Sequence, residues 1–449
     1  MNPVTTNAMR TGRGLSVGLA SLMDARQAEE RAAASVSSSA PASIRAAAAT
    51  TSGAPVTPRA FTCRCGRPLF FGNSQCLACH TPLGYEPDSH RLMPLEPAGP
   101  ALTEAHRNGT APPAAFWREA GADSTAALWR RCRNQDTAAA CNWVVAEGDT
   151  LSGDLPLCRS CRLTRTVPDL SVPEHLGWWN RIEQAKRRLV SSLIGLKLPV
   201  LSKINEDPQR GLVFDLLRAA PGAPPIITGH KDGVITIDVE EADDAWREQC
   251  RAGLGEPYRT LLGHLRHETG HYYWQRLVQG SRWLRPWRVQ FGDERQDYAA
   301  ALRRHYMQGP RADWGQHFVS AYASSHPWED WAETWAHYLH LVDTLDTARS
   351  FGLDGERVAL NYERYTVKDL GTGEGAQARE FLKLMHNWME LTGVLNELSR
   401  SMGVPDYYPF VLSLPAVRKL FLVHRMITAT HSAAQAVAPA VRRSAEVPS

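Results

Sequence analysis

Apolar positions recur with helical spacing through the second half of the chain and define most of its predicted secondary structure. Between residues 174 and 194, for example, Trp178, Ile182, Ala185 and Leu189 fall on one side of a helix, as a spacing of three and four residues requires. The same spacing predicts further amphipathic helices. These span residues 241–253, 257–278, 297–307, 326–347, 380–398 and 413–431.

Strand signals are fewer and lie ahead of most of these helices. Leu212–Leu217 and Val234–Val239 are predicted to be strands, and the sequence Gly229–Gly233 between them predicts a turn. The segment Gly233–Asp238 is a candidate to bind an extended peptide by backbone pairing. An ordinary core strand explains its pattern at least as well.

Composition divides the chain into regions. The first 58 residues are rich in small and turn-forming residues, with few large apolar ones, and are predicted to be disordered. The regions that follow are a Cys-rich region at 59–168, a core at 169–375, a helical part at 376–434 and a flexible tail at 435–449. Within the Cys-rich region, 87–113 is predicted to be a connector and 114–131 a short helix.

Composition and charge are those of an ordinary soluble protein. The 449 residues are 43% hydrophobic and 22% charged, and a net charge of +3 gives no strong case for binding nucleic acid or an anionic membrane. No apolar run approaches the length of a membrane span, and no secretion signal is recognisable at the N-terminus. We therefore expect a cytoplasmic protein without a nucleic-acid or membrane partner, and leave its oligomeric state open.

Eight of the nine cysteines form two sets of four. The first set, C-x-C-x10-C-x2-C, contains Cys63, Cys65, Cys76 and Cys79, and the second, C-x8-C-x16-C-x2-C, contains Cys132, Cys141, Cys158 and Cys161. In a cytosolic protein such sets favour tetrahedral zinc–thiolate sites. They predict two structural zincs, with one zinc, disulfides or free thiols as the alternatives. The first set departs from the usual C-x2-C spacing, and the leftover Cys250 is predicted to be a free thiol.

The most informative chemical motif is the run His267-Glu268-Thr269-Gly270-His271, which reads H-E-x-x-H. On a helix, His267 and His271 are one turn apart and project from the same face. Two imidazoles so placed can bind one zinc ion, and Glu268 beside them can take a proton from water. A surface helix with two solvated histidines is the alternative, but the apolar residues of the run suit a buried helix.

A catalytic zinc needs a third protein ligand and an open position. Downstream, Pro327 is well placed to open a helix on which Glu329, Glu333 and His337 share one face beside a stripe of tryptophans. Acidic and imidazole groups next to tryptophans are costly to bury unless they are paired or bound to metal. This helix is therefore a candidate source of the third ligand.

Two other groups compete for a place at the metal. Asp293 and Glu294 follow the histidines closely, but we interpret their segment as a turn and helix cap in which Arg295 partners an acid. His264, three residues before His267, is expected to be a neighbour on the same helix face.

The pattern E-x-x-A-E-x-W-A at residues 329–336 resembles the second helix of gluzincin peptidases, such as the CAAX prenyl proteases and lethal-factor-type peptidases. This resemblance implies that Glu329 is the third zinc ligand and that Glu333 orients His267 or His271. The reverse assignment, with Glu333 as ligand and His337 as its support, remains open.

The same resemblance offers a group to stabilise an oxyanion. Tyr322 lies seven residues before Glu329, which matches the offset of a tyrosine in the lethal-factor-type pattern. His326 and His337 are other candidates for this role. A satisfied core tyrosine is an equally good interpretation of Tyr322.

The resemblance extends over most of the chain, from Phe61 to Gly352 firmly and to about Leu420 loosely. Segments such as CRLTRTVPDLSVPE, GEPYRTLLGHLRHETGHYYW and SAYASSHPWEDWAETWAHYLH are similar to a bacterial family of zinc-binding metallopeptidases with an N-terminal zinc ribbon. The family implies an α+β fold, in which zinc ribbons precede a mainly helical, gluzincin-like core with a small sheet. It also implies one catalytic zinc besides one or two structural zincs.

These patterns predict a zinc-dependent metallopeptidase that hydrolyses bonds in a peptide or protein substrate, with Glu268 activating the water. One alternative is a non-proteolytic docking protein, in which the zinc ribbon does the work and the second metal site is structural. Another is a zinc amidohydrolase that acts on a small peptide-like conjugate. A structural zinc would be expected to have four protein ligands and no need of Glu268.

Overall fold

Two helices that cross at the centre of the molecule carry both halves of the histidine and glutamate pattern. They are α5 (Leu261–Tyr273) and α9 (Pro327–Ser350) in the computed structural model, which describes residues 57–100, 115–149, 151, 156–254, 260–371, 375–408 and 412–443. Trp331 and Trp335 of α9 are completely buried, and the Trp335 ring stacks on Tyr273 of α5 with 4.8 Å between centroids. Buried aromatic rings contributed by both helices therefore hold α5 and α9 together.

The crossing is close because α5 has a glycine where it meets α9. A Cβ atom at Gly270 would lie 2.9 Å from the Ala332 Cα and 3.2 Å from the Trp335 Cβ. The carbonyl oxygen of Gly270 accepts a 2.8 Å hydrogen bond from the Trp331 indole. The backbones of α5 and α9 can come this close only because no side chain lies between them.

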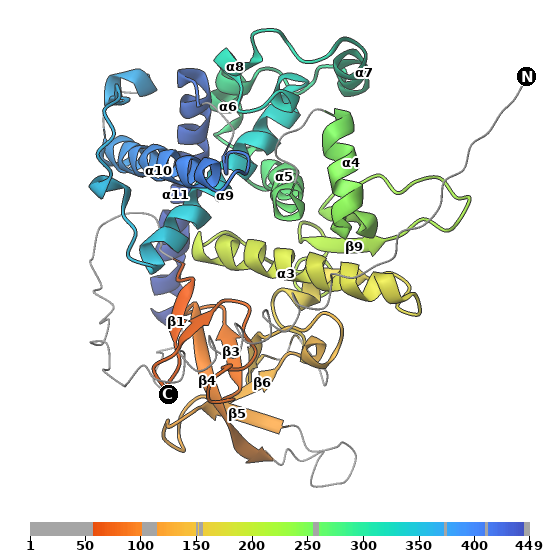
Figure 1. Cartoon of the computed structure of the whole chain (residues 1–449), viewed down its shortest axis with the longest axis vertical. Helices are drawn as coiled ribbons and strands as arrows, with labels where there is room; N and C mark the ends of the chain where they lie inside the picture. The colour runs from red at the N-terminus through yellow and green to blue at the C-terminus, as the bar shows by residue number, and fades with distance from the viewer. Residues whose placement is uncertain are drawn as a thin grey trace, which may run out of the picture. The chain divides into compact units, whose positions relative to one another are not determined.

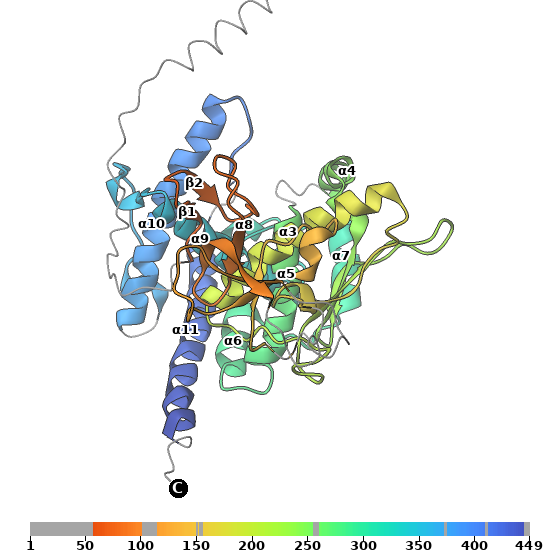
Figure 2. The same cartoon turned by 90° about the horizontal axis from the view of Figure 1, so that it is seen from below.

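Helices surround this pair in Figures 1 and 2, with α10 and α11 to one side of α9 and α5 to the other. The helix α3 (Pro173–Gly195) packs against α5 and separates it from the strands of the Cys-rich region. The remaining α-helices are α4 (Asp244–Leu254), α6 (Leu284–Phe291), α7 (Tyr298–Gln308), α8 (Trp314–His317), α10 (Ala376–Ser401) and α11 (Leu414–Arg443).

A four-stranded sheet lies next to α5, with the order β10-β11-β9-β8. Its strands are β8 (Thr164–Thr166), β9 (Val213–Leu217), β10 (Gly229–Lys231) and β11 (Val234–Asp238). Strand β11, our candidate for peptide pairing, lies between β10 and β9, so both of its edges are occupied. That choice was wrong, because Gly229–Lys231, the first part of the predicted turn, forms the edge strand β10, while Asp232 and Gly233 do form the turn into β11.

The Cys-rich region folds as a hairpin and a five-stranded antiparallel sheet. The hairpin is β1 (Ala60–Thr62) and β2 (Pro68–Phe70), and the sheet is β3 (Leu83–Glu86), β4 (Arg91–Pro100), β5 (Ala115–Glu119), β6 (Trp129–Arg131) and β7 (Val144–Ala146). Strand β8, which precedes the predicted boundary at residue 168, pairs with β9. The Cys-rich region and the helical core therefore share a sheet.

Two predictions in this region are wrong. The expected helix at 114–131 is the strand pair β5 and β6, in which Trp117 pairs with Trp129 and Gly121 has a φ of 84°, a combination that favours a strand and turn over a helix. The expected connector contains β4. There Pro94 accepts a backbone hydrogen bond from Ala120 through its carbonyl oxygen, and proline is tolerated where only this acceptor is needed.

The other predicted helices agree closely with the structure, and the α+β class is confirmed. In the predicted helix 257–278, α5 gives way to a π-helical turn at Trp274–Val278. The helix α11 continues to Arg443, into the predicted tail, because this stretch is rich in alanine, the best helix former. The predicted disordered segment lies outside the described residues except for its last two positions, as does the Cys250 side chain. Among the described helices, none has the length and apolarity needed to cross a membrane.

Substituting Gly270→Ala should force α5 and α9 apart. Because the added methyl group meets backbone, we expect a loss of about 1–3 kcal/mol in the free energy of unfolding, measured by chemical denaturation. The matched control is Gly177→Ala in α3, where nothing lies within 4 Å of the new Cβ; it should be neutral or stabilising by up to about 1 kcal/mol. Equal stability of the two variants would contradict the close approach.

Candidate metal centre

Three potential metal ligands converge where α5 and α9 cross. His267 and His271 contribute one ring nitrogen each and Glu329 one carboxylate oxygen, and all three atoms lie within 4.8 Å of one another. The two imidazole rings, one turn apart on α5, are 5.0 Å apart between centroids. All three residues are buried. The structure thus brings together the first donor set that the sequence predicted.

The start of α9 places Glu329 at this point. Pro327 occupies the first turn, and the His326 ring accepts a hydrogen bond from the Trp328 N–H as the N-cap. Burial raises the pKa of Glu329, but the nearby histidines and the Tyr298 hydroxyl outweigh it and lower the pKa to about 2. The carboxylate is therefore ionised, as a metal ligand must be.

The geometry of these atoms fits a zinc ion. The Glu329 Oε2 atom is buried and lies 3.0 Å from His267 Nε2 and 3.7 Å from His271 Nε2. A buried acceptor that faces two ring nitrogens is costly unless a cation satisfies all three lone pairs. Two imidazoles and a carboxylate are the protein ligands of several catalytic zinc sites.

Glu333 lies behind His267. Its Oε1 atom is 2.7 Å from His267 Nδ1, and its Oε2 atom accepts a 2.6 Å hydrogen bond from the Ser320 hydroxyl. A carboxylate on Nδ1 fixes that nitrogen as the donor and leaves the Nε2 lone pair directed at the centre. This arrangement favours Glu329 as the ligand and Glu333 as the orienting group. It also shows that Ser320, which the sequence analysis did not single out, holds the Glu333 carboxylate.

Glu268 directly follows His267 on α5, and one oxygen of its buried carboxylate contacts a neighbouring side chain. His264 Nε2 is 3.3 Å from Glu268 Oε1, and the other ring nitrogen of His264 bonds to Glu241. Burial lowers the pKa of His264, but the two glutamates outweigh it and raise the pKa to about 10. The Glu268 Oε2 atom is buried without a hydrogen-bond partner in the protein. His264 therefore orients Glu268 and leaves one oxygen of it available.

Two tyrosines border the centre. The Tyr298 hydroxyl, at the start of α7, donates a 2.7 Å hydrogen bond to Glu329 Oε1. The Tyr322 ring lies 6.0 Å from the His267 ring. Sequence reasoning found Tyr322 and missed Tyr298. The only local signal for Tyr298 was its place directly after the N-cap Asp297, which says nothing about the distant Glu329.

The structure assigns other contacts to the two histidines considered for the oxyanion. Both ring nitrogens of His326 face the backbone, one accepting from Trp328 N–H and the other 3.3 Å from Gln296 O. His337 is buried, with its Nδ1 atom 2.6 Å from the Tyr408 hydroxyl. Neither ring belongs to the converging donor set, so their predicted role in the site is not supported by this geometry.

The competing acids lie in ion pairs. Asp293 pairs with Arg295 at 2.8 Å, and Glu294 pairs with Arg288 at 2.5 Å. Asp297 caps α7 by accepting from the Ala300 N–H. These contacts match the turn and cap interpretation, and no acid of this segment joins the donor set.

Each set of four cysteines also converges. Within each set the sulfur atoms lie within 4.8 Å of one another, and the closest pairs are 3.6–3.8 Å apart. Tetrahedral zinc at about 2.3 Å from each sulfur places the sulfurs about 3.8 Å apart, whereas a disulfide requires about 2.05 Å. Gly66, with a φ of 82°, closes the tight turn after Cys65. Both sets therefore have the geometry of thiolate zinc sites.

A histidine pair on one helix, a glutamate from a second helix and a carboxylate next to the first histidine define the class of site found in zinc metallopeptidases. The chain belongs to the family described as "Putative zinc-binding metallo-peptidase", which it matches over residues 175–426, and residues 60–172 match a zinc-ribbon domain. The family resemblance inferred from the sequence is thereby confirmed.

Relatives of similar length occur in mycobacteria. Proteins of Mycobacterium bovis and of two Mycobacterium tuberculosis strains, each described as uncharacterized, are 40% identical to this chain over 371 residues. The match covers 82% of this chain and 95% of theirs. No solved structure matches the chain significantly.

The contacts of Glu333 predict graded effects on metal binding. Glu333→Ala should lower the zinc affinity of the histidine site by about 10–100-fold, because His267 loses the group that orients it, whereas Glu329→Ala should abolish zinc binding at that site. Zinc titration against a chelator measures both, with the exposed residue Glu363→Ala as control. Complete loss in Glu333→Ala with retention in Glu329→Ala would exchange the two roles.

Proposed function

We propose that this protein is a zinc-dependent peptidase that hydrolyses peptide bonds, with its reactive centre at His267, His271 and Glu329. The observation that carries the proposal is the buried Glu268 carboxylate, which directly follows the candidate ligand His267 on α5 and keeps one oxygen without a hydrogen-bond partner in the protein. A zinc ion held there would act as a Lewis acid on the scissile carbonyl and lower the pKa of water towards neutrality.

The side chains of the protein divide the remaining work. Burial raises the pKa of Glu268, but the hydrogen bond from His264 and the nearby histidines lower it to about 2, so the carboxylate is ionised. It is then able to take a proton from the attacking water and pass it to the leaving amine. The hydroxyl of Tyr298 or Tyr322 would donate a hydrogen bond to the oxygen that gains charge.

An extended substrate would find a backbone partner close to this centre. Strand β10 ends the sheet and packs against α5, and its His230 contacts the Tyr272 ring at 6.1 Å between centroids. Such an edge can pair with a peptide main chain. This support favours a peptide or protein substrate over a small amide conjugate.

The docking-protein alternative is weaker because a structural zinc has four protein ligands as a rule. Among the described residues the histidine set contains three, whereas each cysteine set contains four. We therefore assign one catalytic zinc to the histidine set and one structural zinc to each cysteine set. An intracellular location and the absence of nucleic-acid partners remain expectations from the sequence.

Replacing Glu268 separates catalysis from metal binding. Glu268→Gln should retain three zincs per chain and lose at least about 10²–10⁴-fold in kcat on a mixed peptide library, because the amide cannot accept the proton. Glu363→Gln, at an exposed position, is the control. Full activity of Glu268→Gln would refute this mechanism.

The two tyrosines can be ranked by their phenylalanine variants. Tyr298→Phe should lower kcat about 10²–10³-fold if the Tyr298 hydroxyl turns from Glu329 to the reacting oxygen. If the hydroxyl only donates its hydrogen bond to Glu329, the variant would instead weaken zinc binding. Measuring kcat and zinc affinity for Tyr298→Phe and Tyr322→Phe distinguishes these effects. Unchanged kcat in both variants would show that neither hydroxyl takes part in the reaction.

A further inference from the structure

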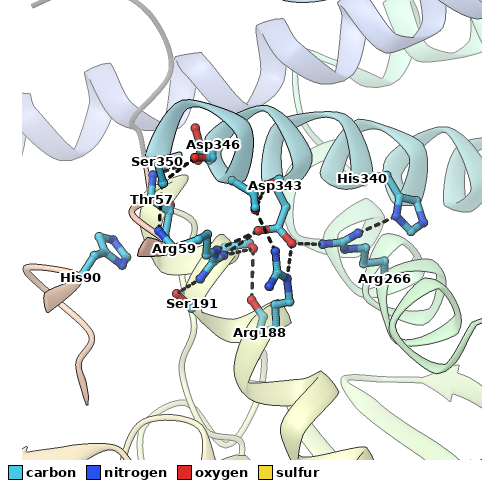
Figure 3. Close-up of polar contacts among 12 residues, drawn as sticks. Thr57, Arg59, His90, Arg188, Ser191, Arg266, His340, Asp343, Asp346 and Ser350 are labelled. Atoms are coloured by element: carbon cyan, nitrogen blue, oxygen red, sulfur yellow. Dashed lines mark hydrogen bonds and ion pairs between the residues drawn. The ribbon is translucent and has the colours of Figure 1, made fainter. Parts of the chain in front are cut away.

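A buried carboxylate far along α9 joins three segments of the chain. Figure 3 shows Asp343 surrounded by Arg59, Arg188 and Arg266. Arg59 bonds to Oδ1 through Nε at 2.9 Å and Nη2 at 2.8 Å. Arg188 and Arg266 both bond to Oδ2, each at 2.7 Å. The two oxygens of one carboxylate are thus held by different parts of the molecule.

The three arginines come from three different segments of the chain. Arg59 precedes β1 of the Cys-rich region, Arg188 lies on α3, and Arg266 lies on α5 directly before the metal ligand His267. The pKa of Asp343 is raised by burial, but the three guanidinium groups outweigh this and hold it well below its usual range. Asp343 is therefore a charged acceptor throughout the neutral range.

Arg266 is fixed at two points on α9. Besides its bond to Asp343, its Nη1 atom lies 2.6 Å from His340 Nδ1. The side chain is almost completely buried, so these contacts set how α5 is rotated against α9 at the residue next to His267. The ligand atoms of His267 and Glu329 must meet within fractions of an ångström, so this rotation matters at the metal centre.

The Cys-rich region is anchored to the same end of α9. The Thr57 N–H donates to Asp346 Oδ2 at 2.9 Å, and the Arg59 N–H donates to the Ser350 hydroxyl at 3.0 Å. The Arg59 guanidinium also reaches the hydroxyls of Ser191 and Ser192 on α3 at 3.0 and 2.9 Å. The first zinc-site cysteine, Cys63, follows four residues later along the chain.

We propose that Asp343 is a positioning residue through which the docked zinc ribbon sets the geometry of the histidine metal centre. A carboxylate rotates as a unit, so Arg59 at Oδ1 fixes Oδ2, and Oδ2 in turn fixes Arg266 beside His267. The proposal rests on the metal site of the proposed function, although not on the reaction. The ribbon is then an integral part of the centre rather than a free docking module.

The test weakens the Oδ1 contact without removing the carboxylate. In Arg59→Met the apolar stem remains and the guanidinium is lost, and in Arg59→Lys the charge remains but the fork does not. The control is Arg91→Met, which removes an exposed ion pair of the same region with Glu119. Each full-length protein is loaded with Co(II), whose absorption bands distinguish the thiolate sites from the histidine site. The loaded protein is then titrated with a chelator. The temperature is one at which a thermal unfolding curve shows that the variant is folded.

In Arg59→Met, the histidine site should bind Co(II) about tenfold more weakly with an altered visible spectrum, as expected when a group that orients a ligand is disturbed. The thiolate bands should not change. Arg59→Lys should give an intermediate loss, and Arg91→Met none. If Arg59→Met does not fold, Arg59→Lys decides the question.

Wild-type affinity and spectrum in the folded Arg59 variants would overturn the proposal and leave Asp343 as a purely structural contact. Peptide hydrolysis by the wild type is measured in parallel. A wild type that binds the metal but cleaves nothing would contradict the proposed function alone, since the comparison of affinities still tests the positioning.

Discussion

The metal centre depends above all on how closely α5 and α9 approach each other. The two histidines are fixed relative to each other by one turn of α5, but Glu329 belongs to another helix. Gly270 removes the side chain that would hold the backbones apart, and Trp331 donates to the carbonyl oxygen that this exposes. Tyr273 and Trp335 then stack across the same contact. The precision of the donor set follows from this packing, because interiors of this density tolerate little displacement.

Burying so many charged groups around the crossing is possible because most of them have a partner from another element. His267 bonds to Glu333 and His264 bonds to Glu241, which places one carboxylate behind each of these rings. In the first turn of α9, Asp330 pairs with Lys419 of α11 at 2.6 Å. Removing one member of such a pair leaves the other as an uncompensated buried charge. These networks therefore specify the relative positions of the helices more sharply than apolar packing alone.

The sequence predicted what local spacing determines and missed what the fold determines. The helices followed from apolar periodicity, and His267 and His271 followed from their separation of four residues. Glu329 required a resemblance, since no spacing connects residue 271 with residue 329. Tyr298 reaches Glu329 only through the placement of α7. The strands β5 and β6 were predicted as a helix, whereas the pairing of Trp117 with Trp129 depends on a turn that periodicity does not reveal. The Arg59–Asp343 contact spans 284 residues and leaves no local signal at all.

The Cys-rich region and the core share more than a boundary. Strand β8 pairs with β9, one hydrophobic core includes Cys63, Trp143 and Trp335, and Arg59 reaches α9. Metal binding by thiolates contributes its free energy to the folding of the segment that carries them. Because Arg59 of that segment is an ion-pair partner of Asp343, the positioning that we propose would let part of this free energy hold α3, α5 and α9 together. Under that proposal the thiolate sites and the histidine site would be thermodynamically linked. Any effect of the first on metal affinity at the second would then be matched by an equal effect in return.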